Sequence, residues 1–255
     1  MNLPPATLIV VLIAAWYVMI PWKVWKEMKP QGAWDMESFD PGQHGSVAQA
    51  TAFLATNVSP LIAQGFRQVG DLVHLGPMNT TRVAVLTHPD EDVVATVVVV
   101  ATLRGSQAAM VEFTAVLVSG TVFDVNNSPV LGAFGRSPDH VTYRFPGVRD
   151  PERLHRIAQA LLRRDFGSAQ LRRQDLSDPA AFLKAATDRE YQRQVRTGYY
   201  RFDATTGRYA QTLKGAYLMA WKLMFPFKTI RKALYAQKAR RVLQEIGMDR
   251  ERVRP

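Results

Sequence analysis

The chain has 255 residues, no cysteine and a formal net charge of +10. Without cysteine it forms no disulfide, holds no iron–sulfur cluster through thiolates and has no cysteine nucleophile. The charge is uneven, because the last 105 residues carry 23 basic and 10 acidic side chains, whereas the first 150 are slightly acidic. A basic region of this size favours an anionic partner.

An uncharged, mostly apolar run extends from Ala6 to Trp22 and is followed at once by lysines. Its 17 residues are near the minimum that crosses a hydrocarbon core of about 30 Å. Lysines beside a span favour the cytoplasmic side. We therefore expect residues 1–29 to form a single transmembrane anchor in a bacterial inner membrane, with the amino terminus outside and the remaining chain in the cytoplasm. The predicted anchor residues are Leu8, Ile9, Val10, Leu12, Ile13, Trp16, Tyr17 and Trp22.

Two other interpretations of this run stay open. A cleaved secretory signal normally has a basic region before the apolar run and a small-residue cleavage site after it, whereas Trp22 and Lys23 follow here. A buried core helix has a similar composition.

Residues 30–46 are rich in proline, glycine and acidic side chains, which predicts an irregular linker. The apolar residues Trp34, Met36 and Phe39 within it are expected to lie against a surface of this protein or of a partner. Residues 47–75 follow a helical spacing that is interrupted at Ser59-Pro60, so we expect two helical pieces there.

From residue 81 the pattern changes to that of strands. Alternating and β-branched runs up to Asn127, with a further run at His140 to Phe145, predict an antiparallel sheet of four or five strands. The run from Val97 to Val100 is apolar on both faces, which indicates a central strand covered on both sides. Asp150-Pro151 then provides the N-cap and first residue of a helix. Residues 47–165 are thus predicted to form one α+β domain in which helices pack on the sheet.

Two segments of this domain, VEFTAVLVSGTVFDVNNSP at 111–129 and FPGVRDPERLHRIAQALLRR at 145–164, carry a resemblance. Together they resemble uncharacterised bacterial membrane-anchored α+β proteins of unknown activity, over about residues 110–165. The resemblance supports the α+β prediction and implies no catalytic residue.

Residues 166–255 are predicted to be a basic helical region. A helix begins at Asp178-Pro179 and ends near Arg196, a loop covers 198–207, and Pro226 divides the final helical stretch. Between Arg208 and Arg241 there are nine basic and no acidic residues, interleaved with aromatic side chains. Such a segment suits the headgroup layer of a membrane, a partner subunit or the second face of the protein's own sheet.

The expected partners are anionic lipid headgroups and integral membrane protein subunits, and not nucleic acid, because no nucleic-acid-binding motif accompanies the charge. The residues predicted to make these contacts are Lys23, Lys26, Lys29, Lys214, Trp221, Lys222, Phe225, Phe227, Lys228, Arg231 and Lys232.

A search for catalytic patterns yields no nucleophile elbow, phosphate-binding loop, dinucleotide fingerprint or metalloprotease motif. The five histidines have no metal-ligand spacing, so we predict no catalytic residue, no cofactor and no metal. Pairs such as His88 or His140 with Asp124 or Asp139 remain the route to a site assembled by the fold.

We therefore expect a non-catalytic accessory or scaffold subunit of a membrane complex. One alternative is an autonomous module that binds anionic lipid. The other is an enzyme, which would require a concave pocket whose polar groups have perturbed pKa values.

Overall fold

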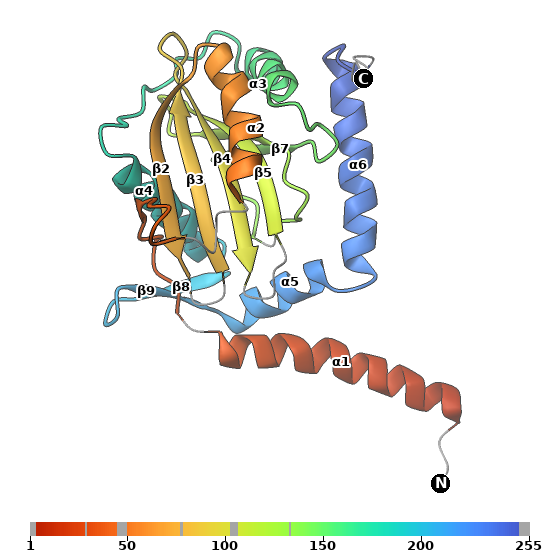
Figure 1. Cartoon of the computed structure of the whole chain (residues 1–255). Coiled ribbons are helices and arrows are strands. Elements are labelled where there is room, and N and C mark those ends of the chain that lie inside the picture. Colours follow the sequence, from red (N-terminus) through yellow and green to blue (C-terminus); the bar gives the residue numbers. More distant parts are fainter. Residues whose placement is uncertain are drawn as a thin grey trace. The chain divides into compact units, whose positions relative to one another are not determined.

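The computed structural model describes residues 4–28, 30–44, 50–76, 79–102, 107–132 and 134–249 (Figure 1). The chain forms two compact units, each assembled from three separate segments. Unit 1 consists of Met1–Ala33, Leu131–Arg136 and Ala186–Ala233. Unit 2 consists of Trp34–Val130, Ser137–Ala185 and Leu234–Pro255.

A seven-stranded sheet forms the centre of unit 2, and its strands follow one another in chain order. Neighbouring strands are antiparallel except for β6 and β7, which are parallel. The predicted α+β class agrees with this architecture, but the sheet has more strands than predicted and is mixed. The strands are β1 Glu37–Ser38, β2 Arg67–Leu75, β3 Asn79–Thr87, β4 Val93–Thr102, β5 Gln107–Val116, β6 Val122–Asn126 and β7 His140–Arg144.

Strand β2 replaces the second predicted helical piece. The helix α2, Ala50–Ala63, contains Pro60 and is followed by Gly65 at φ +98°, a conformation that glycine adopts without a Cβ clash. The chain then reverses and pairs with β3 from Arg67 to Leu75. The apolar spacing in β2 suits a helix or a strand, and pairing with β3 decides between them. The predicted start of this region at Val47 lies outside the described residues.

One face of the sheet packs against helices of unit 2. Helix α3, Pro151–Phe166, begins as predicted, because Asp150 accepts a hydrogen bond from the Glu152 amide at 3.0 Å. α2 and α3 lie over this face (Figure 1), and their apolar side chains are buried against it. Val242, near the end of helix α6, Phe227–Glu245, joins the same core. That end of the basic region therefore contributes to the protein's own core.

The opposite face of β3 and β4 has a smaller apolar core. Val98 points into it, whereas Val97 and Val99 belong to the first core, so β4 is covered on both sides as predicted. Phe182 and Leu183, from the start of helix α4, Pro179–Arg196, pack over this second core.

The apolar residues of the predicted linker lie on this protein's own surface. The Trp34 ring stacks on His74 with 5.6 Å between the ring centroids. Met36 packs on the second core, and Phe39 packs on the first.

Unit 1 combines helices with a two-stranded hairpin. Its core is a cluster of buried tyrosines, in which Tyr191 of α4 stacks on Tyr209 with 5.0 Å between the centroids. The hairpin strand β8 occupies part of the predicted 198–207 loop. The other elements of unit 1 are helix α1 Pro5–Glu27, strands β8 Tyr200–Asp203 and β9 Arg208–Gln211, and helix α5 Leu213–Leu223.

The predicted transmembrane anchor is wrong. Among the described residues, no helix has the length and apolar character needed to cross a membrane. The run from Ala6 to Trp22 is helical, but it belongs to a helix that continues through Lys23 and whose last turn holds Lys26 and Glu27. The same finding contradicts the predicted single-pass topology and inner-membrane location.

Candidate binding face of unit 1

The formal charge of the whole chain belongs to unit 1. Its three segments contain 14 basic and 4 acidic side chains, whereas unit 2 contains 18 of each. Unit 1 is therefore a strongly cationic body, and unit 2 is electrically balanced. Long-range attraction to an anionic surface would act on unit 1.

Exposed apolar side chains concentrate on the same unit. Of the 22 large hydrophobic residues that are exposed in the described part of the chain, 16 belong to unit 1. An accumulation of this kind marks a binding surface. The 16 residues are Leu8, Val11, Trp16, Val18, Met19, Trp22, Trp25, Met28, Phe134, Phe202, Leu213, Trp221, Leu223, Phe225, Phe227 and Ile230.

Helix α1 is hydrogen-bonded to α5 at a backbone carbonyl that a proline within α1 leaves without its helical partner. Pro21 lies inside α1 and has no amide hydrogen, so the Tyr17 carbonyl lacks its usual partner four residues later. The indole Nε1 of Trp221 donates to that carbonyl at 3.1 Å. A tryptophan on one helix thus completes the backbone bonding that a proline leaves open on the other.

Two further contacts hold α1, one from α5 and one from the start of α6. The Tyr217 hydroxyl donates to the Val18 carbonyl at 3.1 Å. The Tyr17 ring of α1 also meets the Phe227 ring edge to face, with 6.4 Å between their centroids, and Phe227 is the first residue of α6. The second half of α1 consequently runs along α5 (Figure 1).

The hairpin fixes α5 in turn. Thr212 caps α5 by accepting from the Gly215 amide at 2.9 Å, and its hydroxyl donates to the Gly198 carbonyl at 2.7 Å. Gly215 lies so close to the hairpin that a Cβ there would be 2.1 Å from the Tyr199 carbonyl oxygen. Only glycine permits this approach.

The predicted contact residues divide into two groups. Lys222 donates to the Tyr199 hydroxyl at 2.7 Å, and Arg231 donates to the Gly132 carbonyl at 2.9 Å, so both stabilise unit 1 internally. Lys29 lies outside the described residues. The exposed members of the predicted set are Lys23, Lys26, Lys214, Trp221, Phe225, Phe227, Lys228 and Lys232.

The predicted anchor residues are likewise divided. Leu8, Trp16 and Trp22 are exposed, and Tyr17 is half-buried beside α5. The side chains of Ile9, Val10, Leu12 and Ile13 lie outside the described part of the structure.

Sequence reasoning missed several exposed apolar residues. Leu213, Leu223 and Ile230 are exposed among the basic residues of the tail, where helical periodicity alone does not separate core from surface.

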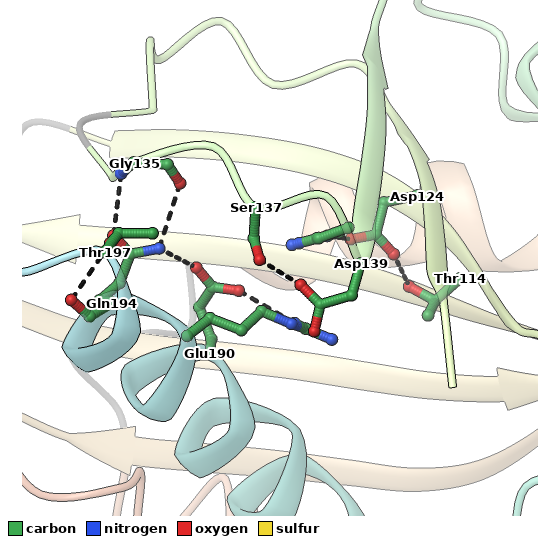
Figure 2. A network of polar contacts seen from close by, with 10 residues as sticks. Thr114, Asp124, Gly135, Ser137, Asp139, Glu190, Gln194 and Thr197 are labelled. Atoms are coloured by element: carbon green, nitrogen blue, oxygen red, sulfur yellow. Dashed lines mark hydrogen bonds and ion pairs between the residues drawn. The ribbon is translucent and has the colours of Figure 1, made fainter. Parts of the chain in front are cut away.

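A polar cluster on the sheet of unit 2 brings together one of the histidine–carboxylate pairs considered from sequence. His140 on β7 hydrogen-bonds Asp124 on β6, and the Thr114 hydroxyl on β5 donates to the same carboxylate at 2.7 Å (Figure 2). Asn126 donates to the Glu112 carboxylate at 2.9 Å. Desolvation, reinforced by the charge of Asp124, raises the pKa of Glu112 to about 8.

These bonds satisfy the carboxylates from within the sheet. The neighbouring Ser137 hydroxyl likewise bonds Asp139 rather than a histidine (Figure 2). The two hydroxyls of the cluster, those of Thr114 and Ser137, thus bond carboxylates and not an imidazole base, so we assign the cluster to the pairing of β5, β6 and β7.

Unit 1 has its own polar contacts at α4. The Gln194 side chain is fully buried, accepts from the Gly135 amide at 2.8 Å and donates to Glu190 at 2.7 Å (Figure 2). These bonds fix the 131–136 segment to α4. Within the described ranges, no group of three or more histidine or acidic side chains is placed to hold a metal ion.

These features define a class: an α+β protein with a basic helical unit that exposes tryptophan and phenylalanine. No protein-family model matches the chain, and neither a curated protein nor a solved structure matches it significantly.

Proposed function

We propose that unit 1 binds the surface of an anionic membrane, with α1 and α5 lying in the headgroup layer. The observation that carries this proposal is the coincidence of all the net charge and most of the exposed large hydrophobic residues in one unit. Either feature alone has ordinary explanations. Together they match the chemistry of an interfacial helix, in which apolar side chains enter the acyl boundary and lysines meet lipid phosphates.

The exposed tryptophans make the interface layer the favoured depth. Indole rings prefer the boundary between headgroups and acyl chains, and Trp16, Trp22 and Trp25 of α1 are all exposed. Burying apolar area stabilises the bound state by about 25 cal/mol per Å2. Each lysine or arginine near an anionic surface adds about 1 kcal/mol.

The function that follows is non-catalytic attachment to a lipid surface. Unit 2 has no net charge and is brought to the surface because it belongs to the same chain. The accessory or scaffold role predicted from the sequence takes this form, in which unit 1 supplies attachment and unit 2 is available to partner subunits.

The test is flotation of the full chain with vesicles of two compositions. We expect binding to phosphatidylglycerol vesicles at least about tenfold tighter than to phosphatidylcholine vesicles, and weakening as salt rises, because salt screens exposed charges. Equal binding to both compositions contradicts the proposal. Failure to bind either vesicle while the chain co-purifies with a protein subunit also contradicts it.

A charge-matched pair of variants locates the binding face. The unit 1 variant changes Lys23, Lys26, Lys228 and Lys232 to glutamine, and all four side chains are exposed. We expect its affinity for phosphatidylglycerol vesicles to fall at least about tenfold. The control variant changes four exposed arginines of unit 2 to glutamine and should bind almost as the parent does. These arginines are Arg67, Arg149, Arg172 and Arg173.

A further inference from the structure

Unit 2 contains a cavity of about 450 Å3 between the β3–β4 turn, the sheet and α3. This volume falls in the range of small-molecule sites. The cavity lies wholly within unit 2, and no residue of α1 or α5 lines it.

The inner part of the cavity is apolar. Phe113 and Phe123 come from β5 and β6, Leu162 comes from α3, and Leu171 comes from the segment after α3. Phe113 and Phe123 are almost fully buried in the core, which fixes their rings in place. These rings form the rigid floor of the cavity, and the half-buried side chains of Leu162 and Leu171 offer a ligand the accessible apolar surface.

Polar side chains of α3 and of the β3–β4 turn meet at the cavity. His155 of α3 hydrogen-bonds the Glu91 carboxylate at 2.9 Å, and Gln159 donates to the other oxygen of Glu91 at 2.6 Å. The second ring nitrogen of His155 contacts the Gln64 side chain at 3.1 Å. Both imidazole nitrogens are thus occupied, so the geometry favours binding over proton transfer to a substrate.

The charged groups around the cavity are mainly acidic. Asp90, Glu91 and Asp92 supply three carboxylates, against the guanidinium of Arg163. The hydrogen bond from His155 lowers the pKa of Glu91, so this carboxylate is ionised at neutral pH. The lining stays net negative even when His155 is counted as a cation.

We propose that this cavity binds a small apolar molecule that carries a protonated amine. The apolar body lies against Leu162 and Leu171 over the buried rings of Phe113 and Phe123, and the ammonium group faces the carboxylates of the β3–β4 turn. Carboxylate oxygens hold further acceptor lone pairs beyond those used by His155 and Gln159, so Glu91 can accept a bond from the ammonium as well. A carboxylic acid of the same shape would meet like charge.

The probe is 1-naphthylmethylamine, with 1-naphthylmethanol as its neutral isostere, titrated calorimetrically into the full chain. We expect the amine to bind at least about tenfold tighter than the alcohol, because charge-assisted hydrogen bonds are stronger than neutral ones. Equal affinity for the two probes overturns the proposal. So does the absence of amine binding at millimolar concentration.

Two variants test the assigned location. Changing Asp90 and Asp92 to asparagine removes two carboxylates, which should weaken amine binding at least about threefold and leave the alcohol unaffected. The expected loss is modest, because both residues lie in a solvent-accessible turn where their charge is screened. Asp175→Asn, an exposed acid that does not line the cavity, is the matched control. Leu171→Trp fills the cavity and should abolish binding of both probes. Unchanged binding in either the double variant or Leu171→Trp overturns the proposal.

Discussion

Glu112 occupies an unusual position for a carboxyl group. It lies on β5 and pairs with Asn126 of β6, the strand that also carries Asp124. Its pKa is raised to about 8, mainly by desolvation and secondly by the charge of Asp124. Its ordinary pKa of 4.5 applies in the unfolded chain. The folded state therefore retains a proton that the unfolded state loses between these two values.

This difference predicts a pH-dependent stability. As pH rises from about 4.5 to about 8, the unfolded state gains charge more easily, so the free energy of unfolding falls, and it levels off above that window. Glu112→Gln should remove this loss and gain about 1 to 3 kcal/mol relative to the parent between pH 4.5 and 9. Urea denaturation at several pH values measures it.

The control is Asp249→Asn, which changes an exposed acid. Its stability curve should run parallel to that of the parent. If the curve of Glu112→Gln runs parallel as well, Glu112 is not the group whose protonation differs between the two states.

Gly215 provides a second residue-scale prediction. Alanine there would place its Cβ 2.1 Å from the Tyr199 carbonyl oxygen, so α5 would have to move away from the hairpin. We expect Gly215→Ala to destabilise unit 1 by about 2 kcal/mol or more. Thermal unfolding followed by circular dichroism measures the change. Gly32→Ala, with nothing within 4 Å of its added Cβ, should leave stability nearly unchanged.

The position of helix α1 depends on a hydrogen bond from another helix, α5. Its apolar composition alone resembles a membrane span, and its position beside α5 depends on the bond from Trp221 to the Tyr17 carbonyl. The two residues are 204 positions apart in the sequence. Local patterns indicate that Pro21 frees a carbonyl, but they do not indicate which side chain will bond it.

Trp221→Phe tests this bond at the scale of the helix pair. Phenylalanine keeps an aromatic ring and removes the Nε1 donor, so the variant should lose about 1 kcal/mol of stability. Hydrogen exchange of the amides in the second half of α1 should speed up. Trp16→Phe is the control, because Trp16 is exposed on α1 and is not the donor to the Tyr17 carbonyl. Equal exchange rates in parent and Trp221→Phe would show that this bond does not hold α1.

Elements with strong terminal signals were predictable. Asp150-Pro151 begins α3, Asp178-Pro179 begins α4, and Pro226 separates α5 from α6, because caps and prolines act through their immediate neighbours. β2 was not predictable, since its apolar spacing fits a helix and its partner strand lies beyond a turn. The short strands β1 and β8 carry too few residues to show a period.

At the scale of the whole molecule, the basic tail was recognised from the sequence as a surface for lipid, a partner or the protein's own sheet. The structure divides it, because Val242 and its neighbours join the core of unit 2 while Trp221 and Phe225 are exposed in unit 1. The sequence does not show that α1 and the 131–136 segment belong to the same unit as α5. Because these segments belong to one unit, the whole net charge of the chain lies on unit 1.

The most direct test of the central claim is the depth of the tryptophans in bound vesicles. The full chain is mixed with phosphatidylglycerol vesicles that contain phosphatidylcholine brominated either near the headgroup or near the chain end. If α1 and α5 lie in the headgroup layer, tryptophan emission should shift to the blue, and the shallow bromines should quench it more strongly. Unchanged emission, or stronger quenching by the deep bromines, would contradict the account.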